Sequence, residues 1–217
     1  MRRRSGLRVV TSYLDHAPPT PQQALGGLAG EGAGDAVVLP LLLTAAYHSK
    51  TDIPGALAGV RRAHPRLNLR YGSTLGPHPL MTGALERRLA EAGVTPGPET
   101  ALVLAAAGTS DPAANATISS MARRWGGWRC VVPAYASAAR PTPAEAVRAL
   151  HESGARRVAV ASYFLAPGLF ADKVREEALE AGAVGVSTAL GAAPELAEII
   201  RQRYQEIVTH GEHAAVG

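Results

Sequence analysis

The residues with the clearest capacity for chemistry are His48 and Asp52, which follow an apolar run at 36–43. This run has the length and composition of a parallel strand buried on both faces, and open α/β sheets bind ligands at the carboxyl ends of their strands. A separation of four residues places both side chains on one face of a helix. A neutral imidazole there can bind a transition metal or accept a proton near pH 7. A helix cap followed by a surface acid is the plainer interpretation of the same spacing.

Three further polar residues stand at ends of predicted elements. Asp15 and His16 follow a strand predicted at 7–13, again at a carboxyl edge, although a loop cap explains them equally well. His78 precedes a helix predicted at 79–92. It is positioned to bind a carboxylate of a ligand, or else it packs at the start of the helix.

The elements that must position these residues alternate regularly between strand and helix. Strands are predicted at 7–13, 36–43, 67–71, 101–106, 129–135, 157–165 and 184–188, and helices at 19–32, 49–63, 79–92, 112–125, 142–153, 170–181 and 194–208. This alternation is typical of parallel βαβ units. A stiff Pro-Gly-Pro linker at 94–100 separates two predicted lobes, residues 1–93 and 101–217.

The two lobes are copies of one another. Residues 7–43 shifted by 122 positions fall on 129–165 with 13 of 37 residues identical, and Leu75-Gly76 falls on Leu190-Gly191 when the second copy is seven residues shorter. The sequence therefore predicts an α/β protein with two flavodoxin-like parallel-sheet lobes related by internal duplication.

The repeat also indicates which lobe carries the site. His48 corresponds to Phe170 in the second lobe. Asp15 and His16 correspond to Ser137 and Ala138. Polar side chains of the first lobe are thus replaced by apolar or small ones, as expected when a duplicated enzyme keeps one of its two sites.

The first lobe has no counterpart of the strand and helix that open the second lobe at 101–125, because a shift of 122 positions would place them before Met1. We expect that about 22 residues of this unit are missing from the first copy; alternatively, the duplication never included it. Without that strand, 7–13 and 36–43 must pair directly or leave a gap in the sheet. A gap would weaken the first lobe and make the chain a poor enzyme, because unpaired backbone groups are costly to bury.

Composition and charge narrow the classes of partner. The formal net charge of +4 favours an anionic ligand, and a polyanionic small molecule suits it better than nucleic acid because the arginines are scattered and aromatic residues make up only 5%. A solvated basic surface explains the charge as well. No apolar run is long enough to span a membrane. The single cysteine, Cys130, fits a reducing compartment, and we expect a cytoplasmic protein.

Three stretches carry a family resemblance: LPLLLTAAYHSKTDIP at 39–54, YLDHAPPTP at 13–21 and LGPHPL at 75–80. With them the chain resembles the sirohydrochlorin chelatases of the CbiX/SirB type, which are class II tetrapyrrole chelatases. The resemblance implies insertion of Co²⁺ or Fe²⁺ into sirohydrochlorin, in cobalamin or siroheme biosynthesis, without ATP. The metal would be a substrate and no cofactor would be bound permanently. The tetrapyrrole would be the partner of a monomer or homodimer.

The resemblance also implies roles for single residues. His48 matches the second histidine of the family pattern and is expected to be catalytic and a metal ligand, with Asp15 as a further metal ligand. His16, His78 and Asp52 are expected to bind the substrate. The first histidine motif of the family is matched in the second lobe by residues 107–112, with Ala107 in place of the histidine, and the first lobe's copy would lie in the missing segment. Two other classes stay open: a degenerate, non-catalytic tetrapyrrole or metal-binding protein, and a flavodoxin-like domain unrelated to chelation.

Overall fold

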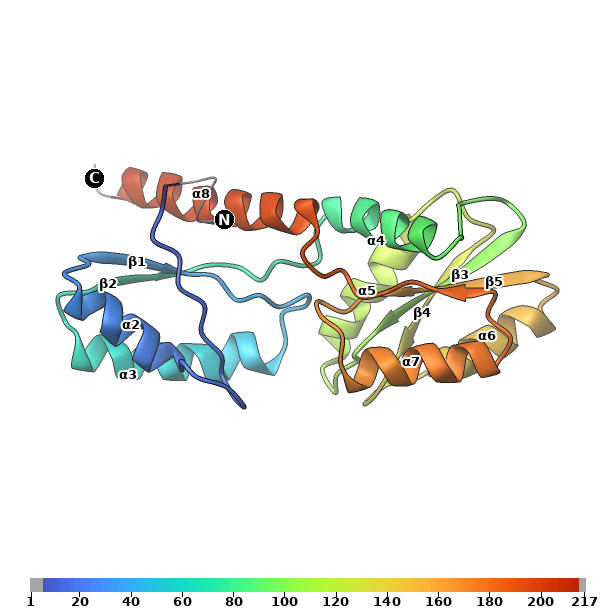
Figure 1. Ribbon diagram of the computed structural model, residues 1–217, viewed down its shortest axis with the longest axis horizontal. Helices are drawn as coiled ribbons and strands as arrows, with labels where there is room; N and C mark the ends of the chain where they lie inside the picture. Colours follow the sequence, from blue (N-terminus) through green and yellow to red (C-terminus); the bar gives the residue numbers. More distant parts are fainter. Residues whose placement is uncertain (1–5, 215–217) are drawn as a thin grey trace. The chain divides into compact units, whose positions relative to one another are not determined.

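The computed structural model describes residues 6–214, which form two compact units (Figure 1). The first unit contains the chain up to Leu75 together with the residues from Ala197 onward, and the second contains Gly76–Leu196. This division differs from the predicted lobes, 1–93 and 101–217. The helix at 80–91 groups with the second unit, and most of the last helix groups with the first.

The first unit is built on a two-stranded parallel sheet. Its elements are α2 (Pro21–Gly30), β1 (Asp35–Val38), η1 (His48–Asp52), α3 (Ile53–Ala63), β2 (Asn68–Tyr71) and most of α8 (Pro194–Ala214). Helix α2 starts at a capping box, in which Thr20 and Gln23 satisfy each other's backbone amides. Helices α2 and α3 lie together on one side of the sheet, and α8 lies on the other (Figure 1).

Two close contacts fix α8 on the sheet. A Cβ atom added to Gly72 would lie 2.4 Å from Cδ1 of Ile207 and 2.5 Å from Cδ2 of Leu39, so the side chain of Ile207 packs directly against the backbone of Gly72. Arg203 of α8 also donates from Nε to the carbonyl of Thr74, at 3.0 Å. The last helix therefore closes the open face of β1 and β2.

The strand predicted at 7–13 is wrong, because residues 6–13 form no strand. Its counterpart β4 (Val131–Tyr135) pairs only with β3 (Thr100–Ala106), and the first half has no copy of β3 to pair with. Neither expected outcome applies as stated, because both required a strand at 7–13; across residues 6–214, β1 pairs with β2 alone.

The strand predicted at 36–43 is also shorter than expected, since β1 ends at Val38. The matching strand β5 (Arg157–Ser162) continues to Ser162, whose N–H donates to Oγ of Ser187 at 2.9 Å. In the first half Pro40 stands at the position of Ser162 and has no N–H to donate.

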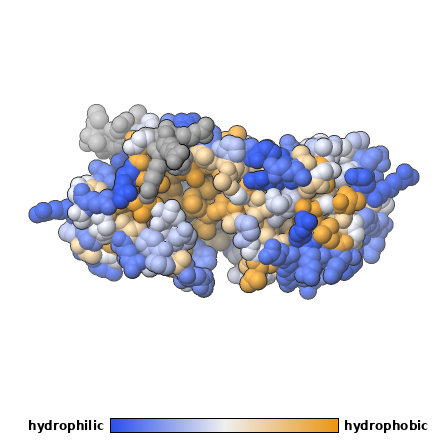
Figure 2. Space-filling view, in the orientation of Figure 1, coloured by the Kyte–Doolittle hydropathy of each residue, from blue (hydrophilic) through white to orange (hydrophobic). Residues whose placement is uncertain are grey.

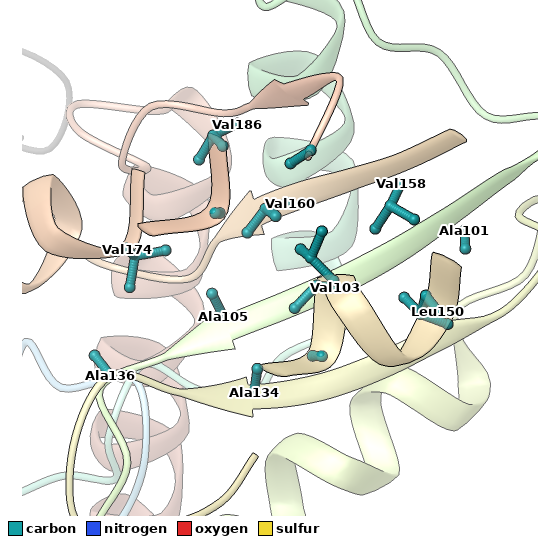
Figure 3. Close-up of a cluster of buried hydrophobic side chains, with 14 of the residues drawn as sticks. Ala101, Val103, Ala105, Ala134, Ala136, Leu150, Val158, Val160, Val174 and Val186 are labelled. Carbon is teal, nitrogen blue, oxygen red and sulfur yellow. The ribbon is translucent and has the colours of Figure 1, made fainter. Parts of the chain in front are cut away.

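The second unit contains a complete four-stranded parallel sheet in the order β4-β3-β5-β6. Its remaining elements are α4 (Leu80–Glu91), α5 (Pro112–Arg124), α6 (Pro143–Glu152), α7 (Leu169–Glu180) and β6 (Gly185–Val186). All seven residues of β3 are buried, as expected of a central strand. Side chains of β3 and β5 pack against Leu150 of α6 and Val174 of α7 in the main core (Figure 3).

The strand register confirms the internal duplication and the α/β fold class. Val37 and Val38 pair with Arg70 and Tyr71 in the first unit. Ala159 and Val160 pair with Gly185 and Val186 in the second unit. These are the same pairs under the 122-residue shift, once the second copy is shortened by seven residues. Across residues 6–214, no helix has the length and apolar character needed to cross a membrane.

Candidate functional site

His48 begins a single turn of π-helix, η1, which continues directly into α3. The sequence predicted an ordinary helix from residue 49. Turns of this kind are rare and are often found at functional sites, because the wider turn changes the direction of the side chains. The π turn therefore supports His48, which the sequence had already indicated, as a candidate functional residue.

One hydrogen bond ties η1 to the sheet, and a second joins it to the residues just before it. Tyr71, the last residue of β2, donates its hydroxyl to the carbonyl of Ser49 at 2.9 Å. The Ser49 hydroxyl donates to the carbonyl of Ala46, also at 2.9 Å. Burial raises the pKa of Tyr71, so its hydroxyl stays a neutral donor. The end of β2 therefore positions the turn that carries His48.

The side chains of His48 and Asp52 form the central pair of the site. Nδ1 of His48 lies 2.6 Å from Oδ2 of Asp52. A carboxylate only accepts hydrogen bonds, so Nδ1 is the donor in this pair, and in a neutral imidazole the lone pair is then on Nε2. The His48 side chain is 58% exposed, which leaves Nε2 accessible to a ligand. Neither residue caps a helix with its side chain, so the plainer interpretation of this spacing is not supported.

Tyr47 is a part of this site that the sequence reasoning missed. Its side chain is 65% exposed and its ring lies edge-on to the imidazole of His48, with the two ring centroids 6.3 Å apart. The sequence did contain a signal for Tyr47, because it is an aromatic residue directly before the candidate ligand His48. The exposed ring gives the site an apolar surface beside the histidine.

Asp15 and Asp52 come together in one open pocket of about 470 Å³. The other lining residues are Leu14, Thr20, Pro21, Gln22, Gly55 and Ala56. Thr20 and Gln22 were not foreseen, although their place at the start of α2, beside Asp15, could have suggested them. The pocket provides carboxylate, amide and hydroxyl oxygens, which can bind cations or hydrogen-bonding ligands.

The structure does not gather the remaining expected residues into a metal site. Among the residues that the structure describes, no three His, Cys, Asp or Glu side chains lie close enough together to hold a metal ion. His16 is exposed with a left-handed backbone, φ 65°, as is its counterpart Ala138 with φ 57°. His78 belongs to the second unit, where its Nδ1 accepts the N–H of Leu80 at 3.2 Å and caps the start of α4.

Comparisons with known proteins identify the family of this chain. The sequence matches the CbiX family over residues 1–92 and 101–207. It is 29% identical over 217 residues to a sirohydrochlorin cobaltochelatase of Priestia megaterium, covering 93% of this chain and 70% of that protein. It is 25% identical over 208 residues to a sirohydrochlorin ferrochelatase of Bacillus subtilis, covering 93% of this chain and 79% of that protein.

The fold is also found in solved structures. SirB from Bacillus subtilis with Fe³⁺ has a TM-score of 0.81 at 23% identity, covering 93% of this chain and 82% of that one. CbiX, described as the terminal enzyme of siroheme biosynthesis in denitrifying bacteria, has a TM-score of 0.61 at 20% identity, covering 86% of this chain and 80% of that one. With the family match extending over most of its length, this chain belongs to the CbiX family.

Proposed function

We propose that this protein is a sirohydrochlorin chelatase, which inserts Co²⁺ or Fe²⁺ into sirohydrochlorin without ATP. The observation that carries the proposal is the hydrogen bond between His48 and Asp52, which leaves Nε2 of an exposed imidazole free at the carboxyl end of a sheet. Membership of the CbiX family and the named activities of its relatives support the same reaction.

The reaction exchanges one divalent cation for two protons. The metal loses part of its water shell and binds the four ring nitrogens, and the two pyrrole N–H groups release their protons. Nε2 of His48 can serve this exchange as a ligand that takes the place of water on the incoming metal. It can also serve as the base that accepts a leaving proton.

Asp52 assists in both roles. Positive charge develops on the imidazole when Nε2 binds a metal or a proton, and the carboxylate of Asp52 stabilises that charge through Nδ1–H. We propose Asp15 as a second ligand for the metal on its way to the ring, because it lines the pocket that Asp52 also lines. His16 and His78 remain proposed substrate contacts.

A non-catalytic tetrapyrrole or metal-binding protein is the second candidate. One observation favours it: within residues 6–214 a single histidine, rather than a group of three ligands, marks the candidate site. Such a protein would bind the ring or the metal but would not join them faster than they react in solution.

The two candidates are separated by following the absorbance change of sirohydrochlorin on metal insertion, under anaerobic conditions when Fe²⁺ is used. We expect the wild-type protein to exceed the spontaneous rate and His48→Ala to fall to it. His64→Ala, a histidine at the end of α3 outside the site, is the matched control and should keep the wild-type rate. Full activity in His48→Ala, or a wild-type rate no faster than the spontaneous one, would reject the proposal.

A further inference from the structure

The connection from α3 to β2 carries a concentration of positive charge. Residues 61–71 contain four arginines and one histidine, and no Asp or Glu. Arg61 and Arg62 lie in the last turn of α3, Arg66 lies just after the helix, and all three are exposed. This end of the first unit is coloured as hydrophilic in Figure 2. The first unit therefore has a basic region at the amino end of β2.

The second copy of the repeat forms the same connection without this charge. Under the register that matches Tyr71 with Val186, residues 61–71 correspond to 176–186. That stretch contains three glutamates and no Arg, Lys or His. The dipole of α3 favours positive charge in its last turn, but it does not account for Arg66, which follows the helix. The fold therefore does not require the arginines of the first copy.

An open pocket of about 390 Å³ lies at this connection, and its lining residues are Arg61, Pro65, Arg66, Leu67, Asn68 and Leu69. Nη2 of Arg61 donates to the carbonyl of Leu69 at 3.1 Å, which holds the guanidinium beside β2 and leaves its other N–H donors for a ligand. Arg66 forms no ion pair and no side-chain hydrogen bond within residues 6–214. Two guanidinium groups thus line one pocket that no carboxylate lines.

Two acidic residues lie at this end of the sheet, and both are already paired. Asp35, the first residue of β1, accepts from Nδ2 of Asn68 at 2.7 Å and lies 3.6 Å from Nη2 of Arg70. Glu31, which follows α2, accepts two hydrogen bonds from Arg8. Neither acid lines the pocket. Its positive charge is therefore not balanced by these carboxylates.

We propose that this pocket binds a small multivalent oxyanion, a molecule that carries phosphate or carboxylate groups. A planar guanidinium can donate two parallel N–H bonds to such a group, and hydrogen bonds between charged partners are stronger than neutral ones. Arg61 and Arg66 supply these donors. Pro65 and Leu67 give the same pocket an apolar part, which suits an anion with a small organic body.

This anion site is separate from the candidate catalytic site. Strands β1 and β2 are parallel, so their amino ends lie together at one edge of the sheet and their carboxyl ends at the other. The arginine-lined pocket is at the amino end of β2, whereas His48 follows the carboxyl end of β1. The inference therefore does not depend on the proposed function, and it is tested without the insertion reaction.

The test titrates the whole chain with inorganic phosphate and, separately, with citrate, at an ionic strength held constant with sodium chloride, and follows the heat of binding. We expect the wild-type protein to bind at least one of the two anions saturably, with one site per chain. Arg66→Gln should raise the Kd about tenfold or more, because it removes charged hydrogen bonds. Arg61→Lys should also raise the Kd, since it keeps the charge but loses the planar pair of donors.

The matched control is Arg156→Gln, which changes an exposed arginine directly before β5 in the second unit and should keep the wild-type Kd. Arg66→Gln and Arg156→Gln should both keep the wild-type unfolding temperature in the absence of the anion. His48→Ala should bind the anion as the wild type does, and a loss of binding in this variant would overturn the separate site.

The phosphate and citrate titrations show which kind of oxyanion the pocket prefers. Equal Kd values for the wild type and Arg66→Gln would overturn the inference, as would the absence of saturable binding of either anion. Binding of poly-glutamate that Arg66→Gln weakens, with no binding of either small anion, would also overturn it, because the arginines would then form a docking surface for an acidic chain.

Discussion

Oδ2 of Asp52 lies 2.6 Å from Nδ1 of His48, one turn earlier in the chain. The substitution Asp52→Asn keeps the size of the side chain but removes the negative charge that stabilises a positively charged imidazole. Loss of such a partner typically lowers metal affinity or activity about 10- to 100-fold, and we expect a decrease of that order in the insertion rate. Stopped-flow absorbance with Co²⁺ measures it. An unchanged rate in Asp52→Asn would show that the hydrogen bond has no part in the reaction.

Tyr71→Phe should loosen the π turn that carries His48. The substitution removes the hydroxyl that donates to the carbonyl of Ser49 and leaves that acceptor without this bond. We expect a loss of about 1 kcal/mol in the free energy of unfolding, together with slower insertion. Urea denaturation measures the first and the insertion assay the second. Tyr204→Phe, on α8, is the control and should change neither.

The contribution of Glu195 to stability should depend on pH. Its carboxylate accepts from Nη2 of Arg87 at 2.7 Å, and this hydrogen bond holds the pKa of Glu195 below its usual value, against the opposing effect of burial. A carboxyl group whose pKa is lowered by folding stabilises the fold above its unfolded pKa, about 4.3, and loses that effect as the pH falls through the folded pKa.

Glu195→Gln should therefore lower the free energy of unfolding at pH 7 and have a much smaller effect near pH 3. Urea denaturation at the two pH values measures the difference. Glu180→Gln, an exposed glutamate on α7, is the control. An effect of Glu195→Gln that is the same at both pH values would show that packing, rather than the ion pair with Arg87, accounts for it.

Gly108→Ala should destabilise the second unit. Gly108 has φ +82°, and an added Cβ would lie 2.1 Å from the carbonyl oxygen of Ser137. The left-handed backbone alone costs an alanine about 1 kcal/mol or more, and the clash adds to it. Gly83→Ala is the matched control, since Gly83 lies in α4 with no atom within 4 Å of an added Cβ. We expect it to stabilise the fold by about 0.5–1 kcal/mol, as measured by urea denaturation.

The sequence predicted the strands of the second unit well because each of them has an adjacent strand to pair with, so its local preference for β structure can be realised. The predicted strand at 157–165 is β5, which lies between β3 and β6. The run LRVVTSY at 7–13 has equal strand character but no strand to pair with, so local preference alone did not decide its structure. Strand formation depends on the partner as much as on the sequence of the strand itself.

Two features of the site could not be predicted from the spacing of residues in the sequence. The spacing of His48 and Asp52 predicted that they share a face, and they do, but it could not distinguish a π turn from an α-helical one. Asp15 was chosen for its place at a strand end. Its place in one pocket with Asp52 depends on how the loop after Tyr13 folds over α3, which neither motif reveals.

The free edge of β1 should be visible in hydrogen–deuterium exchange. The carbonyl of Val38 accepts the N–H of Gly72 at 3.0 Å, so the backbone groups of Val38 face β2 and those of Val37 face the other edge, where the sheet as described has no strand. The amide of Val37 should therefore exchange far faster than that of Val38. Their counterparts Ala159 and Val160, between β3 and β6, should both exchange slowly. Mass spectrometry should thus find that the Val37 amide exchanges about as fast as the amide of an unfolded peptide, whereas the adjacent Val38 amide is protected.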